Sequence, residues 1–167
     1  ANLYNFEDTE QLNVIRQYPL APDTTTYLTF TDLAPGMYWL KVMDNREGFK
    51  FTEITNSQVA IYQSKNHPLN TTHRNNFYFQ VPKTVDLFVL RKTGAATIIS
   101  PAGRTIDLEE YNKTDLLVEA EKNEKGFWRV QNQKGLFIVE GIPPFFVRDN
   151  EDFPQIERKK CFLKFWK

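Results

Sequence analysis

The chain has 167 residues, of which 41% are hydrophobic and 14% aromatic, a composition typical of a β-rich globular protein. Lys and Arg total 21, and Asp and Glu also total 21, so the formal net charge is zero. Because nucleic-acid binders normally carry a basic excess, we expect no nucleic-acid partner. No apolar run approaches the roughly 20 residues of a membrane-spanning helix, so we expect no membrane span.

The length favours a single domain covering residues 1–167, because neither a linker nor a composition break divides the chain. Cys161 is the one cysteine, which excludes an intramolecular disulfide and a paired-cysteine zinc site. The first residues have neither a basic nor an apolar region, so we expect a mature protein or an excised fragment without a signal peptide.

The N-terminal part of the chain predicts three strands separated by turns. Residues 12–18 and 24–31 are rich in β-branched and aromatic residues, with a Pro-containing segment between them. The segment 33–36 places Pro and Gly where a tight turn needs them. Residues 37–44 then alternate between two faces, which is typical of a strand with one buried side.

Short aromatic and β-branched runs continue through the middle of the chain. The polar residues 64–76 are expected to form a loop that leads into a strand at 77–82, which a proline ends. Residues 85–91 and 96–100 predict two further strands. Residues 101–103 predict a tight turn after them.

Residues 107–125 contain good helix formers, but their apolar spacing follows a helix only loosely. The run at 116–121, followed by the run at 127–132, favours a hairpin instead. Two more short runs, residues 135–141 and 143–147, complete the series. The whole pattern predicts an all-β fold, an antiparallel β-sandwich or jelly roll.

The tail, residues 153–167, mixes basic and aromatic residues. We expect a final edge strand there, which would complete a sheet. The alternative is an amphipathic arm that contacts a partner or a membrane surface.

Residues that could carry catalysis lack the spacing that such chemistry needs. His67 and His73 do not have the spacing of zinc ligands, no serine lies in a nucleophile-elbow motif, and no glycine-rich phosphate loop is present. Glu119 and Glu121 would share one strand face, and paired carboxylates do hydrolyse glycosides. Neighbouring lysines favour an ordinary solvated face there, so we expect no enzyme and no catalytic residue.

Two oxygen-rich turns are candidates for calcium. Asp44 and Glu47 lie in one, and Asp149 and Asp152 lie in the other. Ca²⁺ takes carboxylate and carbonyl oxygens, but neither turn follows EF-hand spacing, and Asp and Asn favour turns without any ion. We expect no metal site and no cofactor beyond a structural calcium that these turns could hold.

Exposed aromatic rings are the feature that points to a ligand. Trp39 is expected on the strand face opposite the apolar residues of 37–44. Tyr62 borders the polar segment, and Tyr78 lies on the face opposite its phenylalanine neighbours. Because Tyr and Trp rings stack on flat ligands such as sugar rings, these three are the predicted aromatic contacts.

Polar contacts that orient sugar hydroxyls are expected from the segment that precedes Tyr78. The candidates there are His73, Arg74 and Asn76. Trp128, by contrast, is expected in the core, on the same face as Val130, because a β-sandwich commonly builds its core around a Trp.

Four runs resemble β-sandwich accessory modules of polysaccharide-degrading enzymes: FYFQVPK at 77–83, ISPAGRTID at 99–107, GFWRVQ at 126–131 and GIPPFFV at 141–147. The segment 27–42 is similar to a strand pair of the same modules. The resemblance implies a galactose-binding-like jelly roll that holds an enzyme on polysaccharide. It also implies an attached catalytic domain and an extracellular or cell-surface location, as part of a larger secreted protein.

Two functions of different classes therefore compete. The first is a non-catalytic carbohydrate-binding module, in which exposed rings stack on sugars and loop amides fix their orientation. The second is a structural or protein-interaction β-sandwich, such as a spacer or adhesin-like module, whose aromatic residues are mostly buried. A small glycoside-active enzyme that uses paired carboxylates is a third and less favoured alternative.

Overall fold

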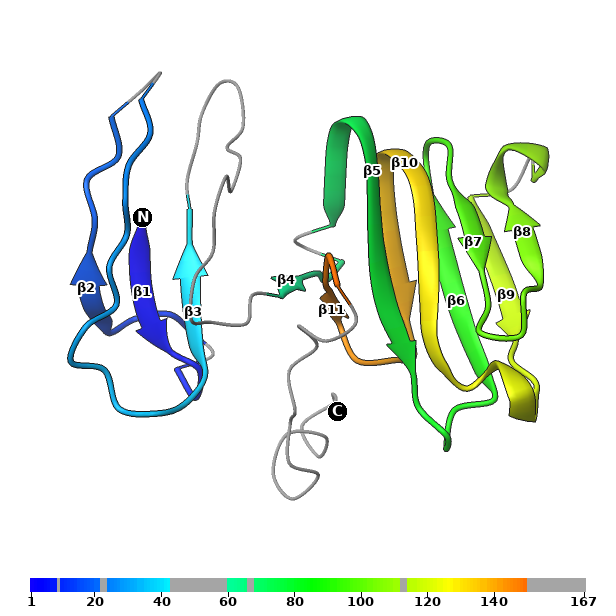
Figure 1. The fold of residues 1–167 in the computed structure, drawn as a ribbon, viewed down its shortest axis with the longest axis horizontal. Coiled ribbons are helices and arrows are strands. Elements are labelled where there is room, and N and C mark those ends of the chain that lie inside the picture. The colour runs from blue at the N-terminus through cyan, green and yellow to red at the C-terminus, as the bar shows by residue number, and fades with distance from the viewer. Residues whose placement is uncertain (9, 22–23, 43–59, 66–67, 112–113, 150–167) are drawn as a thin grey trace. The chain divides into compact units, whose positions relative to one another are not determined.

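The computed structural model describes residues 1–149 except 9, 22–23, 43–59, 66–67 and 112–113 (Figure 1). These residues build an all-β fold of antiparallel strands, which confirms the fold class expected from the sequence. The chain divides into two compact units, Ala1–Thr52 and Glu53–Lys167, and each is described by itself. The expectation of one domain over the whole chain stays a prediction, and the tail strand expected at 153–167 lies outside the described residues. Among the described residues, no helix is long and apolar enough to cross a membrane.

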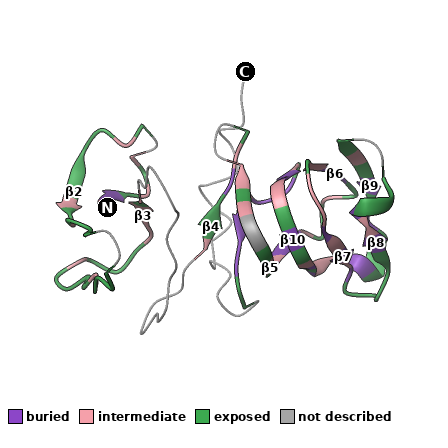
Figure 2. Ribbon diagram, turned by 90° about the horizontal axis from the view of Figure 1, so that it is seen from above, coloured by how far each residue is buried: buried purple, intermediate pink, exposed green. Residues whose placement is uncertain are grey.

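The first unit contains a sheet in which β1 (Asn2–Asn5) lies between β2 (Val14–Gln17) and β3 (Tyr38–Lys41). Strands β2 and β3 lie within the predicted segments 12–18 and 37–44, which confirms both. Leu3 and Tyr4 of β1 are buried, whereas β2 is mostly exposed (Figure 2).

The strand predicted at 24–31 is wrong, because its described residues join no strand ladder. Two side chains, from Arg16 in β2 and from Tyr18 just after it, contact a backbone carbonyl of this segment instead. The Tyr18 hydroxyl donates to the Thr29 carbonyl at 3.0 Å, and Arg16 Nη1 approaches the same oxygen at 3.5 Å. Alternating apolar and polar residues are therefore not sufficient for a strand here, because the segment lacks the partner strand that a sheet requires.

The second unit contains most of the strands, together with two short 3₁₀ turns. In chain order its elements are β4 (Ile61–Tyr62), β5 (Leu69–Val81), β6 (Leu87–Lys92), β7 (Thr97–Ile99), β8 (Thr105–Asp107), η1 (Leu108–Glu110), β9 (Asp115–Glu119), η2 (Lys122–Glu124), β10 (Gly126–Glu140) and β11 (Phe145–Phe146). The six-stranded sheet has the order β8-β7-β10-β6-β9, with β5 also paired to β10, and β11 pairs with β4 in a separate ladder.

Strand β10 organises this sheet. It runs beside β5 over most of its length (Figure 1). On its other side, residues 129–131 pair with β7 and residues 137–140 pair with β6. The sheet therefore has two halves: the first half-sheet comprises β7, β8, the beginning of β10 and the adjoining end of β5, and the second half-sheet comprises β6, β9 and the end of β10.

One hydrophobic core lies under both half-sheets. Buried side chains from β5 to β11 form a single cluster, which includes Phe77, Phe79, Val81, Phe88, Leu90, Ile98, Ile106, Val118, Trp128, Val130, Phe137, Val139 and Phe146. Because one cluster collects side chains from both half-sheets, the sheet must curl around it. Burying each large side chain of this kind contributes about 1.5–3 kcal/mol, so the core is the main source of stability.

Trp128 lies at the centre of the core, as the alternation in its strand predicts. Its ring stacks on Phe79 at 6.1 Å between centroids and meets Phe88 edge-on at 5.3 Å. Its indole Nε1 donates to the Glu124 carbonyl at 2.7 Å, which satisfies the one polar atom of the side chain. The next residue that shares its face, Val130, is also fully buried, which confirms that part of the prediction.

The polar segment 64–76 is not the loop that its composition suggests, because residues 69–76 form the first half of β5. They pair with β10, where Thr71 lies opposite Gly135 and Leu69 opposite Phe137. The partner strand satisfies the backbone of this segment, so its polar side chains do not need to belong to a loop.

The hairpin expected over 116–132 is also wrong, although both of its strands exist. Strand β9 pairs with β6, with Leu116 opposite Leu90, and β10 pairs with β5, β6 and β7. The two runs at 126–131 and 135–141 are one 15-residue strand rather than two. Gly135, at φ 88°, bends this strand instead of ending it.

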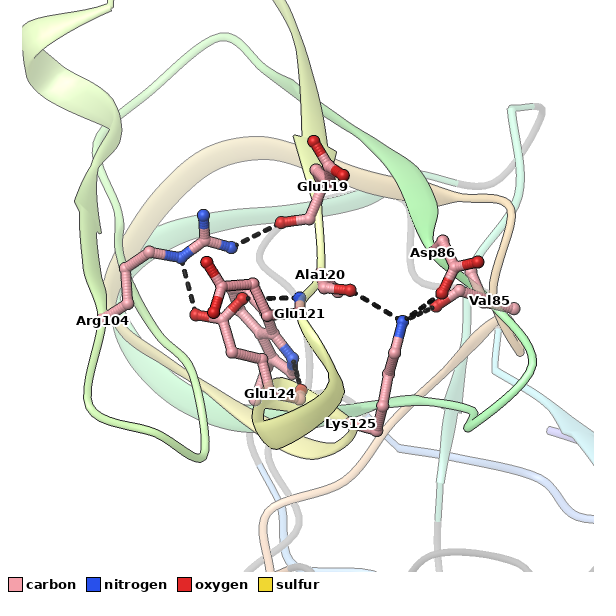
Figure 3. A network of polar contacts seen from close by, with 9 residues as sticks. Val85, Asp86, Arg104, Glu119, Ala120, Glu121, Glu124 and Lys125 are labelled. Atoms are coloured by element: carbon pink, nitrogen blue, oxygen red, sulfur yellow. Dashed lines mark hydrogen bonds and ion pairs between the residues drawn. The ribbon is translucent and has the colours of Figure 1, made fainter.

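An ion pair fixes η2 against the core (Figure 3). Arg104 Nε lies 2.7 Å from the buried Glu124 carboxylate, and Arg104 Nη2 donates to the Glu119 carbonyl at 2.7 Å. The guanidinium also lies 5.4 Å from the centre of the Trp128 ring, within the range of a cation–π interaction. Glu124 Oε2 in turn accepts from the Glu121 backbone N–H at 3.1 Å, which completes the cap of the turn.

Lys125 joins two loops on the other side of η2 (Figure 3). Its Nζ donates to the Asp86 carboxylate at 2.8 Å, to the Ala120 carbonyl at 2.8 Å and to the Val85 carbonyl. The ammonium beside it lowers the pKa of the Asp86 carboxyl below its ordinary value, first by the hydrogen bond and then by its charge. These contacts tie the beginning of β6 to the end of β9.

Candidate functional site

Three of the predicted binding residues lie on one face of β5. Along this strand Phe77 and Phe79 are buried, while Arg74 and Asn76 are exposed and Tyr78 is half-buried. Since successive strand residues point to opposite faces, Arg74, Asn76 and Tyr78 share the outer face, away from the core. The predicted position of Tyr78, opposite its phenylalanine neighbours, is confirmed.

A row of side chains crosses the outer face of the first half-sheet. Tyr78 lies opposite Arg129 of β10, Arg129 lies opposite Ile99 of β7, and Ile99 lies opposite Thr105 of β8. Residues directly opposite one another in an antiparallel ladder present their side chains on the same face. The row therefore places an aromatic ring, a guanidinium, an aliphatic group and a hydroxyl side by side.

A second row runs parallel to the first, two residues further along each strand. Gln131 of β10 lies opposite Thr97 of β7, and Thr97 lies opposite Asp107 of β8. These side chains are half-buried, and all three are polar. We call the two rows, together with Arg74 and Asn76 of β5, the polar face.

A pocket of about 150 Å³ adjoins the polar face at the second row. It is lined by Arg74, Ala95, Ala96, Thr97, Asp107, Glu109 and Asn132. Four strands and η1 contribute to the polar face and the pocket, so both depend on the tertiary fold rather than on one segment.

An irregular stretch of β10 forms one wall of the pocket. Asn132 has a φ of 56°, a left-handed conformation that is uncommon outside glycine but tolerated by Asn. Its backbone N–H donates to Asn76 Oδ1 at 3.0 Å, so Asn76 of the polar face holds the pocket wall in place. Bulges of this kind frequently lie next to functional sites.

The neighbour of Asn132 anchors the same stretch from inside. Gln133 is buried, and its Oε1 accepts from the Thr71 hydroxyl at 2.7 Å while its Nε2 donates to the Gly135 carbonyl at 2.6 Å. These two contacts satisfy both ends of a buried amide, which fixes the bulge rigidly.

The opposite wall of the pocket is a capped 3₁₀ turn. Asp107 Oδ1 accepts from the backbone N–H of Glu109 at 3.0 Å, as an N-cap residue does. This contact orients the Asp107 carboxylate at the end of β8. Arg74 lines the same pocket, and it makes no ion pair within the described part of the chain.

The other predicted aromatic contacts lie elsewhere in the chain. Trp39 is in β3 of the first unit and is half-buried, with Phe6 stacked on its ring at 4.6 Å and its Nε1 donating to the Phe6 carbonyl at 3.0 Å. One face of the indole is therefore occupied by Phe6.

Tyr62 is in β4 and exposed, and its ring is 6.1 Å from that of Phe145, its partner in the β11 ladder. His73 lies in β5, where only its backbone is described.

The calcium prediction remains untested. Asp149 is exposed, and Asp44, Glu47 and Asp152 lie outside the described residues. The described residues contain no group of three or more His, Cys, Asp or Glu side chains that could hold a metal ion.

The carboxylates considered for glycoside hydrolysis do not share a strand face. Glu119 ends β9, but Glu121 lies beyond the strand as the N-cap of η2. Glu121 therefore has a structural position, where its backbone and side chain close the capping box with Glu124.

Several residues of the polar face and the pocket were not predicted. Arg129 could have been found, since the alternation that buries Trp128 places its neighbour on the outer face. Asp107, Glu109 and Asn132 could not, because they meet Arg74 only through strand pairings of long sequence separation.

Comparisons of this chain with protein-family models, with curated proteins and with solved structures found no match. The geometry of the polar face and its pocket is therefore the basis for any functional conclusion.

Proposed function

We propose that the second unit is a non-catalytic carbohydrate-binding module and that the polar face is its binding surface. The observation that carries the proposal is the row in which Tyr78 and Arg129 lie in direct register, beside a polar pocket. A half-exposed aromatic ring next to hydrogen-bonding side chains is the combination that a sugar ring needs. Its C–H face packs on an aromatic ring, and its hydroxyls need both donors and acceptors.

The neighbours of Tyr78 supply those donors and acceptors. Arg129 is exposed and has five N–H donors, and it makes no ion pair within the described residues. Gln131 and Thr105 can both donate and accept. The row is also continuous, because its members stand in register on four adjacent strands of one half-sheet, which suits an extended polysaccharide chain.

Affinity electrophoresis in soluble polysaccharides tests this function. We expect the wild-type protein to be retarded by at least one glycan, and Tyr78→Ala or Arg129→Ala to weaken retention about 5- to 10-fold, since each removes roughly 1–1.5 kcal/mol of contact. Tyr78→Phe keeps the ring and is the matched control, which should retain most of the binding.

Two controls make the result specific. Leu117→Ala changes an exposed side chain of the second half-sheet and should leave retention unchanged. A thermal melt of each variant separates lost binding from lost folding. If no polysaccharide retards the wild type, or if Tyr78→Ala and Arg129→Ala bind as the wild type does, the proposed function is wrong.

The wider role follows from the same proposal. A module that binds glycan without catalysis acts by keeping an attached catalytic domain near its substrate, at an extracellular or cell-surface location. The resemblance of residues 77–83, 99–107, 126–131 and 141–147 to accessory modules of polysaccharide-degrading enzymes supports this role.

A second candidate, a structural or protein-interaction module, is favoured by one observation. On the second half-sheet Leu87 and Leu117 are exposed, and Val89 lies between them, opposite Leu117. These three apolar side chains, which share their face with Arg91, Asp115 and Glu119, suit contact with another protein surface. A protein that ignores every glycan, but that loses a protein contact when Leu117 is changed to Lys, would support this candidate instead.

A further inference from the structure

We infer that the pocket lined by Arg74, Asp107 and Glu109 binds a single neutral sugar unit through its hydroxyls, so that the pocket favours neutral sugar units over acidic ones. The inference rests on the proposed function and deepens it, because it names the class of glycan. It follows from the size of the pocket, its charges and its rigid construction.

The size of the pocket suits one sugar ring. Its volume is about 150 Å³, whereas pockets for drug-sized ligands range over roughly 300–1,000 Å³. The pocket is also continuous with the polar face, because Thr97 and Asp107 belong to both. A glycan chain that lies on the row of Tyr78 and Arg129 can therefore place one of its units or a branch into the pocket.

The charges in the pocket disfavour an anion. One guanidinium, that of Arg74, stands against the two carboxylates of Asp107 and Glu109. A carboxylate or sulfate on a sugar would be attracted by the Arg74 guanidinium and repelled by the two carboxylates. A neutral hydroxyl gains from all three, because it accepts from the guanidinium and donates to a carboxylate.

The construction of the pocket indicates a site that is formed before a ligand arrives. Its wall at Asn132 adopts an uncommon backbone conformation that Asn76 and the buried Gln133 hold in place. Its opposite wall is held by the Asp107 cap. Rigid walls lower the entropic cost of binding, and residues kept in uncommon conformations cluster at functional sites.

The first measurement follows backbone amide resonances of the isotope-labelled full chain during titration with free sugars. Galactose, mannose, glucose and xylose are the neutral probes, and galacturonate and glucuronate are the acidic counterparts of galactose and glucose. We expect at least one neutral sugar to shift the amides of Thr97, Asp107 and Asn132, and the acidic counterparts to shift them at least tenfold more weakly at equal concentration.

The second measurement compares variants by affinity electrophoresis in a neutral and an acidic polysaccharide, galactomannan or xyloglucan against polygalacturonate. Arg74→Gln should weaken neutral binding about tenfold or more, because it removes hydrogen bonds from a charged donor. Asp107→Asn combined with Glu109→Gln keeps hydrogen-bonding groups and, at the cap, a residue that caps as well as Asp. This double variant leaves Arg74 unopposed, so we expect the ratio of neutral to acidic affinity to fall at least tenfold.

The outcomes separate this inference from the proposed function. If the wild type binds a glycan and Tyr78→Ala weakens it, but Arg74→Gln and the pocket amides do not respond, the pocket inference is wrong and the function stands. If acidic glycans bind more tightly than neutral ones, the neutral specificity is wrong and the function again stands. If no glycan binds at all, both are wrong.

Discussion

The two half-sheets of the second unit share β10 and one core, but their outer faces differ in chemistry. The first presents Tyr78 and Arg129 next to a polar pocket, and the second presents Leu87 and Leu117 beside an ion-paired Arg91. The inner faces are alike, because both contribute apolar residues to the same cluster. Packing in the core therefore determines the residues of the inner faces, and a ligand-binding site is to be sought on the outer faces.

The arginines show the same contrast. On the second half-sheet, Arg91 lies 3.7 Å from the Asp115 carboxylate and 3.4 Å from that of Glu140. On the first half-sheet, neither Arg74 nor Arg129 makes an ion pair within the described residues. A guanidinium that forms ion pairs with two carboxylates has fewer free donors for a ligand than one that forms none. The first half-sheet is therefore the better candidate for polar recognition.

Removing the shared core should affect both half-sheets, and we expect the largest effect from Trp128→Ala. The ring is fully buried between Phe79 and Phe88, so its loss should lower the free energy of unfolding by about 3–5 kcal/mol. Chemical denaturation measures this change. Trp128→Phe keeps a ring in the same space and should cost clearly less, and equal losses for the two variants would contradict the central role of the indole.

A change at the junction of the half-sheets should have the next largest effect. Gly94 lies between β6 and β7, where a Cβ would stand 1.9 Å from the Lys134 carbonyl oxygen and 3.1 Å from the Gly135 Cα. Gly94→Ala must therefore push the backbone of β10 away, which should cost about 1–3 kcal/mol or more. Gly36→Ala meets nothing closer than 4.0 Å and is the matched control in a thermal melt. Similar melting temperatures for both variants would show that the β6–β7 connection does not pass so close to the backbone of β10.

The side of each strand that faces the core could be predicted from the sequence, whereas strand pairing could not. Alternation correctly placed Trp128 and Val130 inside and Tyr78 outside. It could not reveal that the polar residues 69–76 have a partner in β10, or that β9 pairs with β6 rather than with its neighbour in sequence. The alternation within a strand predicts which side chains are buried. It does not predict which strands pair, because pairing depends on contacts between residues far apart in the sequence.

The pocket was beyond prediction for the same reason. Arg74 and Asp107 are more than thirty positions apart in the printed sequence, and they meet because β5 and β7 flank the same stretch of β10. The wall at Asn132 depends on a left-handed residue that carries no recognisable turn motif. For Trp39, alternation predicted the face of the strand, but it could not show that Phe6 stacks on the ring.

The contact between Lys125 and Asp86 should make a smaller, pH-dependent contribution at the end of the second half-sheet. Because the pKa of Asp86 in the folded protein lies below its ordinary value of 3.8, the ion pair stabilises the fold above that pH. The contribution is lost as the pH falls from 3.8 through the lowered pKa. Melting temperatures of the wild type and of Asp86→Asn should therefore differ at pH 7 and converge in acid. A difference that persists below the folded pKa would assign the effect to something other than this carboxylate.

The smallest effect on stability is expected at the outer face of the second half-sheet, and it tests the contrast between the two faces directly. Leu117 is 65% exposed, so Leu117→Ser should change the free energy of unfolding by no more than about 0.5 kcal/mol. It should also leave polysaccharide retention unchanged, whereas Tyr78→Ser on the first half-sheet should reduce it. Denaturation and affinity electrophoresis on the two variants measure both quantities. If Leu117→Ser weakened retention as much as Tyr78→Ser did, the glycan would contact the outer face of the second half-sheet, and the assignment of glycan binding to the first half-sheet would be wrong.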